Sequence, residues 1–225
     1  AKVIAQGGDP ERETLTLVRT VSGDSYCRSE DLGCWRAYDL IEGAQSFDEA
    51  ASQEHLFEVA KAFGNFQRLL TDFPASSLAE TIPYFHHTPK RFEAFERAVE
   101  ADSANRVQST KREIDFVLQR QSVMGYLQQL QDSGDLPIRV THNDTKINNV
   151  LVDDRTGKAV CVIDLDTVMP GLVAHDFGDL VRSGASISAE DEPDVDKAGL
   201  SLEAFDTIVR GYVAGAGGSF TGSEL

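Results

Sequence analysis

The sequence predicts an α+β fold, with a small β-rich part over residues 1–43 and a mainly helical part over residues 44–225. Short strand-like runs separated by turn residues fill the first part. Apolar residues recur at helical spacing through most of the second part. Within it, residues 137–163 contain three short apolar runs, which predict a strand followed by a β-hairpin at the junction of the two parts.

The N-terminal part is expected to begin with a helix over residues 1–8, because this segment ends in glycines, which commonly stop helices. Two strands are expected at residues 15–18 and 34–40. Between them, residues 22–25 should form a turn and residues 29–33 a loop. Ile41, Glu42 and Gly43 then form the expected hinge between the two parts.

Five helical stretches are expected in the second part, with apolar faces at residues 56–70, 92–99, 114–130, 177–181 and 202–212. The first follows a capping-box spacing from Ser46 to Glu49 and ends before Pro74. The third is expected to be one long helix that stops near Gly134. Residues 188–197 are acidic and polar, which is typical of a surface loop.

Around the hairpin, residues 137–140 and 149–152 predict strands and residues 153–158 a turn. Residues 159–163 are apolar throughout, so this last strand is expected to be buried on both faces. Such a hairpin would bring the residues that follow it back beside the loop that precedes it.

That loop and the end of the hairpin carry the most informative pattern. Asp144, Lys146 and Asn149 lie close together in the loop, and Asp164 and Asp166 follow the last strand. The order matches a kinase catalytic loop, in which the base and a metal-binding asparagine share one loop and a metal-binding aspartate follows a hairpin. The pattern therefore predicts a phosphoryl-transfer site.

Each of these residues has a chemical reason for its expected role. Asp144 is the candidate base that accepts the proton of an attacking hydroxyl. Asn149 and Asp164 offer the hard oxygen ligands that Mg²⁺ prefers. Lys146 either contacts the transferring phosphate or is a solvated loop lysine. The role of Asp166 has three alternatives: it binds a second metal ion, it binds a substrate hydroxyl, or it forms a structural salt bridge.

His142 is expected to brace the loop through hydrogen bonds to the backbone. His86 and His87, next to Pro83 and Pro89, are expected in an exposed turn between helices.

These motifs also carry a family resemblance. Residues 142–149, Ile163-Asp164 and residues 174–182 resemble the aminoglycoside phosphotransferase and choline kinase group, small-molecule kinases with a protein-kinase-like fold. Residues 162–171 and 176–182, together with the openings at 7–14 and 38–43, are more closely similar to the N-acetylhexosamine 1-kinases.

The resemblance implies an ATP- and Mg²⁺-dependent kinase acting on a small-molecule hydroxyl acceptor, the anomeric hydroxyl of an N-acetylhexosamine. An aminoglycoside, choline or another small alcohol is an alternative acceptor. The resemblance also implies that backbone groups of Ile41, Glu42 and Gly43 bind the adenine, and that Asp176 holds the catalytic loop through backbone donors. Arg182 is either a substrate contact or part of the helix surface.

Kinases of this group carry a phosphate-covering loop and a strand lysine in their N-terminal lobe. Nothing before residue 15 matches either element. The chain is therefore expected to begin partway through that lobe, leaving only a remnant of it, and to end before the family's C-terminus. A non-catalytic, kinase-like binding module is the rival that this absence supports.

Charge and composition limit the classes of molecule that the protein is expected to bind. The formal net charge is −16, from 21 basic and 37 acidic residues, which argues against nucleic acid or an anionic membrane surface as a partner. There is no signal-peptide pattern and no apolar stretch long enough to span a bilayer, so a cytoplasmic location is expected. Three cysteines do not form a disulfide framework.

A second rival uses the same aspartates. Residues 162–168 also fit the first motif of haloacid-dehalogenase-like phosphatases, in which the first aspartate is the nucleophile. That fold requires further strands and a later lysine and acidic pair, whereas the rest of the chain predicts helix and loop. It also leaves residues 142–149 unexplained.

Overall fold

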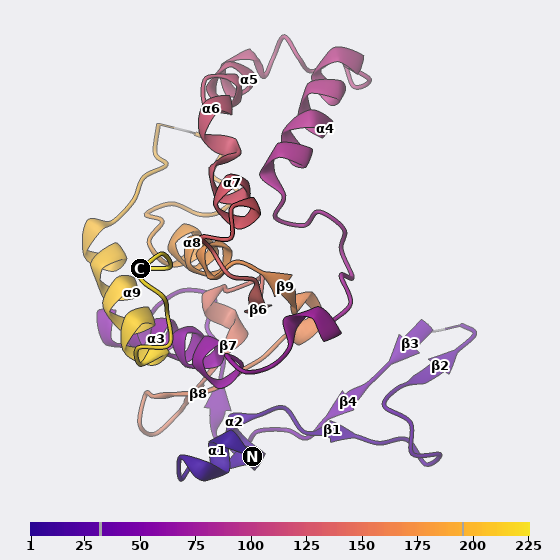
Figure 1. Ribbon diagram of the computed structural model, residues 1–225, viewed down its shortest axis with the longest axis vertical. Coiled ribbons are helices and arrows are strands. Elements are labelled where there is room, and N and C mark those ends of the chain that lie inside the picture. Colours follow the sequence, from indigo (N-terminus) through magenta and orange to yellow (C-terminus); the bar gives the residue numbers. More distant parts are fainter. Residues whose placement is uncertain (32, 195) are drawn as a thin grey trace.

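The computed structural model describes residues 1–31, 33–194 and 196–225, and its architecture is α+β. Its centre contains three helices, α3 (Gln53–Leu69), α8 (Val173–Gly184) and α9 (Leu202–Ala216). Figure 1 shows the N-terminal strands reaching away from this helical centre. Within the described ranges, no helix combines the length and apolar character that a membrane crossing requires.

The N-terminal part begins with the expected helix. α1 (Lys2–Ala5) ends before Gly7, whose φ of 77° lies in the left-handed region that glycine adopts without strain. A second short helix, α2 (Pro10–Glu13), follows, and the Asp9 side chain caps it by accepting a hydrogen bond from the Glu11 N–H.

Two small hairpins follow these helices. β1 (Leu17–Val18) pairs with β4 (Ala37–Tyr38), and β2 (Cys27–Ser29) pairs with β3 (Gly33–Trp35). The single strand expected over residues 34–40 is therefore divided between β3 and β4, and β2 was not expected. Both faces of these strands are mostly exposed. Their sequence therefore has no alternation of apolar and polar residues, which is the pattern that identifies a half-buried strand.

The core lies between α3 and α9. Buried side chains of both helices, including Val59, Phe63 and Ile208, pack together there. The two helices approach closely at Gly64 and Gly215. This contact leaves no room for a side chain, since a Cβ atom on Gly64 would overlap the carbonyl oxygen of Tyr212.

The predicted start of α3 was wrong. Its N-cap is Ser52, which accepts a hydrogen bond from the His55 N–H at 3.2 Å, and not Ser46. The preceding segment forms β5 (Ala44–Gln45), which pairs with β7 (Val150–Asp153) of the hairpin. That pairing keeps the chain extended up to the residue before Ser46, so the capping-box spacing there does not start a helix.

The expected long helix over residues 114–130 is broken into three: α5 (Lys111–Leu118), α6 (Gln121–Met124) and α7 (Tyr126–Asp132). One break falls at Gly125, a residue that weakens helices. Gly134, with a φ of 82°, follows the end of α7 as expected. α4 (Thr88–Ala101) and α5 lie at the end of the molecule opposite the N-terminus (Figure 1).

The expected hairpin consists of β7 (Val150–Asp153) and β8 (Ala159–Val162), in a sheet of order β5-β7-β8. The expectation that the last strand is buried on both faces was wrong. Within β8 only Cys161 is fully buried, and its neighbours are half-buried. β8 lies at the edge of this small sheet, and α2 and α3, which pack against it, cover its side chains only in part.

A separate pair, β6 (Arg139–Thr141) and β9 (Met169–Gly171), joins the segments on either side of the hairpin in antiparallel register. The short helix η2 (Ile147–Asn149) ends the loop before the hairpin, and η3 (Leu165–Thr167) follows the hairpin. A third short helix, η1 (Ala75–Ser77), precedes α4. This framework places residues 142–149 and 164–167 at one end of the hairpin.

Candidate active site

The loop over residues 142–149 is held in place by a buried carboxylate of α8. Asp176 is 1% exposed. Its Oδ2 accepts a hydrogen bond from the His142 N–H at 2.9 Å, and its Oδ1 accepts one from the Asn143 N–H at 2.7 Å. These are the backbone contacts that the resemblance implies for Asp176.

The charge state of Asp176 follows from its surroundings. Burial raises the pKa of this carboxyl, while hydrogen bonds from His142, Asn143 and Gln67 oppose that rise. The Gln67 amide nitrogen lies 2.6 Å from Oδ2. The three hydrogen bonds favour the ionised carboxylate, whereas burial favours the neutral acid.

A second carboxylate of α8 holds the middle of the loop. Asp179 Oδ2 accepts a hydrogen bond from the Thr145 N–H at 2.8 Å. Arg182, one helical turn further along, pairs with Asp179 at 2.8 Å and with Glu190 at 2.8 Å. The Arg182 guanidinium is therefore engaged by carboxylates in this structure, and through Asp179 it supports the loop.

His142 makes the backbone hydrogen bonds expected of a brace. It is fully buried, with its ring against the edges of Phe63 and Phe66. Its Nε2 donates to the Ile163 carbonyl oxygen at 2.9 Å, and its Nδ1 accepts from the Asp144 N–H at 3.3 Å. It thereby ties the loop to the end of β8.

The loop brings Asp144, Lys146 and Asn149 together. The Asn149 amide nitrogen donates to the Asp144 carboxylate at 3.1 Å and to the Asp144 carbonyl oxygen at 2.8 Å. The Lys146 ammonium lies 3.6 Å from the other carboxylate oxygen of Asp144. With its nitrogen engaged, Asn149 has its amide oxygen as the atom suited to bind a cation.

Asp164 lies at the same end of the hairpin as Asn149. Val150 pairs with Val162 across the hairpin, and the Ile163 N–H donates to the Asn149 carbonyl oxygen at 2.9 Å. Asp164 directly follows Ile163, so it lies at the same end of the hairpin as Asn149. It is exposed and has a left-handed φ of 57°. A non-glycine residue in this conformation is uncommon outside turns and functional sites.

This donor set fits a magnesium ion only in part. In the described part of the chain, no three His, Cys, Asp or Glu side chains gather closely enough to hold a metal. Mg²⁺ is commonly held by one or two carboxylates, with phosphate oxygens and waters as further ligands. Asn149 and Asp164 are suited to such a shared site and not to a cage made by protein alone.

Asp166 is bound by a residue of the N-terminal part. It forms an ion pair with Arg36, which lies between β3 and β4 of the N-terminal part. Of the alternatives left open for Asp166, the salt bridge is therefore the one present in the structure.

The hinge residues lie next to the hairpin. Ile41 is buried, and Gly43 has a φ of 66°. The Glu42 carbonyl oxygen accepts a hydrogen bond from Arg12 at 2.7 Å, and the Gly43 carbonyl oxygen accepts one from the Asp154 N–H at 3.0 Å. Both carbonyls are thus bonded to protein, so the two positions contribute to the joint between hinge and hairpin.

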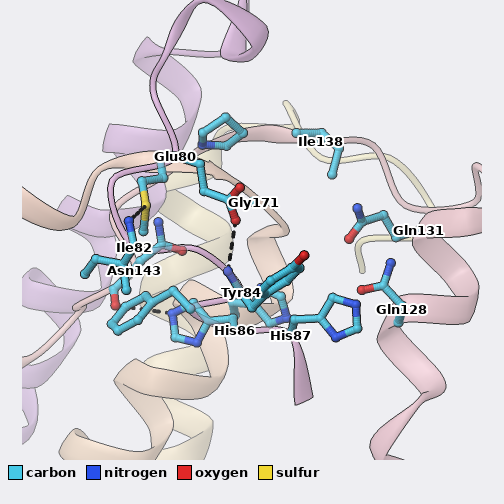
Figure 2. A pocket seen from close by; sticks show the side chains of 14 residues that line it. Glu80, Ile82, Tyr84, His86, His87, Gln128, Gln131, Ile138, Asn143 and Gly171 are labelled. Atoms are coloured by element: carbon cyan, nitrogen blue, oxygen red, sulfur yellow. Dashed lines mark hydrogen bonds between the residues drawn. The ribbon is translucent and has the colours of Figure 1, made fainter. Parts of the chain in front are cut away.

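A cavity of about 220 Å³ lies next to the loop over residues 142–149, between residues 80–87, α7, β9 and the start of α8 (Figure 2). Asn143 lines it, and Asp144 does not. His86 and His87 occupy the expected turn, but they are half-buried against this cavity, so their predicted exposure was wrong. His175 also lines it, and burial followed by the proximity of His86 lowers the pKa of His175 to about 4.

Sequence reasoning missed the contact between this turn and the loop. His86 Nε2 lies 3.3 Å from the Asn143 carbonyl oxygen, although the two residues are far apart in the chain. No local spacing links them, because the intervening helices determine where the turn returns. The adjacent imidazole pair of His86 and His175 had no sequence signal either.

Comparison with known proteins provides a family. The model of a family described as "Phosphotransferase enzyme family" (APH) matches residues 9–208. An aminoglycoside phosphotransferase structure from Alicyclobacillus acidocaldarius is similar over 99% of this chain, with a TM-score of 0.56 and 15% sequence identity. The chain spans 63% of the length of that structure. At this identity the likeness concerns the fold.

Two further structures are similar at lower scores. A microcompartment-associated aminopropanol kinase matches with a TM-score of 0.49 and 17% identity, over 98% of this chain and 71% of that one. An aminoglycoside-3′-phosphotransferase of type VIII matches with a TM-score of 0.46 and 18% identity, over 98% and 72% respectively.

Proposed function

The chain belongs to the phosphotransferase enzyme family, and from that membership we propose that it transfers the γ-phosphoryl group of ATP to a hydroxyl group of a small molecule. The observation that carries this proposal is the convergence of Asp144 and Asn149, whose side chains lie 3.1 Å apart, at the hairpin end where Asp164 also lies. Kinase chemistry needs a base and metal ligands in this arrangement.

Each residue has one task in this mechanism. Asp144 orients the acceptor hydroxyl and accepts its proton as the phosphoryl group is transferred. Asn149 and Asp164 would hold Mg²⁺ against the phosphates, where the ion supplies charge neutralisation. Lys146, which already lies beside the Asp144 carboxylate, swings toward the transferring group and offsets its charge.

The wider assignment follows the same reasoning. Residues 1–43 act as part of a nucleotide-binding lobe, and residues 44–225 act as the catalytic lobe. Backbone groups over residues 41–43 contact the adenine with atoms other than the two carbonyls already bonded to Arg12 and Asp154. His142 and Asp176 keep the loop in shape without entering the chemistry.

For the acceptor, we propose the anomeric hydroxyl of an N-acetylhexosamine. Its support is the similarity of residues 162–171 and 176–182 to the N-acetylhexosamine 1-kinases. Arg182 is the candidate acceptor contact on α8, provided that it exchanges one of its two carboxylate partners for substrate. Aminoglycosides, choline and other small alcohols are the alternative acceptors.

The test is a panel of hydroxylated acceptors incubated with γ-labelled ATP and Mg²⁺, using the intact protein. Label should pass to N-acetylhexosamines, and Asp144→Asn should lower kcat by about 10²–10⁴-fold while ATP affinity stays nearly unchanged. Asp154→Asn, in the exposed hairpin turn, is the control and should retain full activity. Equal turnover in Asp144→Asn would remove this residue from the mechanism.

Two other results would replace the proposal. A folded protein that binds no ATP–Mg²⁺ in calorimetry would be a kinase-like binding module. A phosphoryl group trapped on Asp164, with no label on any acceptor, would indicate a phosphatase-like nucleophile. The fold disfavours the second result, because the described chain after residue 168 contains β9, α8 and α9 and not the repeated strands that such a phosphatase needs.

A further inference from the structure

The peptide group that joins Asn143 to Asp144 is held at both ends by imidazole rings. Its N–H, which belongs to Asp144, donates to His142 Nδ1 at 3.3 Å. Its carbonyl oxygen, which belongs to Asn143, lies 3.3 Å from His86 Nε2. Because a carbonyl can only accept, the hydrogen of this bond lies on the His86 ring. The orientation of this peptide plane determines where the Asp144 side chain leaves the backbone.

Asn143 requires such support. Its φ of 65° is left-handed, a conformation that a non-glycine residue keeps only when its surroundings hold it. Its N–H is bound by Asp176, and its side-chain amide donates to the carbonyl oxygens of Thr141 and Thr167. These partners lie on α8 or on the strands and helix next to the loop. The carbonyl oxygen is bound by a residue outside that framework, His86.

His86 is itself held in place. Its ring lies 4.9 Å from that of His175, centroid to centroid, and 4.5 Å from that of Phe85. His175 directly precedes Asp176 on α8. This helix therefore holds the loop directly through Asp176 and Asp179 and indirectly through His175 and His86. Figure 2 shows His86 pointing at the Asn143 carbonyl from the cavity side. His175 is uncharged at neutral pH, because burial lowers the pKa of its imidazole to about 4.

We propose that His86 is a positioning residue for Asp144: by fixing the Asn143 carbonyl, it sets the peptide plane that aims the base at the acceptor hydroxyl. This role rests on the proposed function of Asp144. His86 does not contact Asp144 itself, so its removal should lower kcat and leave the KM for ATP unchanged.

Hydrogen exchange tests the structural half of the proposal without any need for activity. In His86→Ala, exchange over residues 142–145 should become faster, measured by mass spectrometry on protein whose thermal midpoint shows that it is folded. His86→Gln, which keeps an N–H donor, should restore slow exchange. His87→Ala is the matched control, because His87 lines the same cavity but binds the Lys90 N–H at the start of α4. Unchanged exchange in folded His86→Ala would overturn the proposal.

Kinetics test the other half. Loss of one hydrogen bond should lower kcat by about five- to tenfold in His86→Ala, with recovery in His86→Gln. In an Asp144→Asn background the same change should cost less than about twofold, because His86 acts through Asp144. A full five- to tenfold loss in that background would overturn the role. If the wild type phosphorylates no acceptor while exchange behaves as expected, the proposed function alone fails.

Discussion

Replacing Asp176 with asparagine should destabilise the whole protein as well as the loop over residues 142–149. The carboxylate accepts three hydrogen bonds, from Gln67 at 2.6 Å, Asn143 at 2.7 Å and His142 at 2.9 Å. An asparagine offers one oxygen, and its NH₂ group must face at least one of these donors. A buried donor left without a partner costs about 1–3 kcal/mol, and hydrogen bonds to a charged acceptor contribute about 1.5–3 kcal/mol.

Removing a buried charge offsets part of that loss, because the carboxylate no longer has to be desolvated. We therefore expect Asp176→Asn to lower the free energy of unfolding by about 2–4 kcal/mol. Urea denaturation followed by circular dichroism measures this change. Asp206→Asn is the control, since Asp206 forms an exposed pair with Arg210 on α9, and its loss should cost less than about 0.5 kcal/mol. A midpoint for Asp176→Asn equal to that of the wild type would refute the reasoning.

Three further variants test the helix packing and the half-buried His175. Gly64→Ala should destabilise the protein by about 1–3 kcal/mol in the same assay, because its Cβ would overlap the Tyr212 carbonyl at the contact between α3 and α9. Gly178→Ala on α8 should instead be neutral or slightly stabilising, because its added Cβ would meet no neighbouring atom. The folded-state pKa of His175, about 4, lies below its ordinary 6.5, so the unfolded chain takes up this proton first and stability is lost as pH falls from about 6.5 toward 4. Wild type should therefore lose more stability than His175→Gln between about pH 7 and about pH 5, and an equal loss in both would contradict the shift.

The sequence predicted the parts of the fold that depend on local patterns. The apolar faces of α3, α8 and α9, the hairpin after the catalytic loop and the glycine stop at Gly134 were expected and are present. Each of these signals lies within one element or its immediate flanks. The grouping of Asp144 with Asn149 could be predicted for the same reason, since one short loop carries both residues.

What could not be predicted depends on contacts between distant segments. Ser46 has the spacing of a helix cap, but the pairing of β5 with β7 keeps that segment extended and leaves the cap to Ser52. Arg36 pairs with Asp166, and His86 with Asn143, across separations that no sequence period covers. The exposed N-terminal hairpins lack an apolar alternation that would have located β2.

The most direct test of the site is whether Asn149 and Asp164 bind one divalent cation together with ATP. Mn²⁺, which favours the same oxygen ligands as Mg²⁺, can be followed by electron paramagnetic resonance in the presence of a non-hydrolysable ATP analogue. We expect the wild type to bind Mn²⁺ and Asp164→Ala to bind it at least about tenfold more weakly, with Asp154→Ala in the hairpin turn unchanged. Equal Mn²⁺ affinity in all three proteins would contradict a phosphoryl-transfer site at this end of the hairpin.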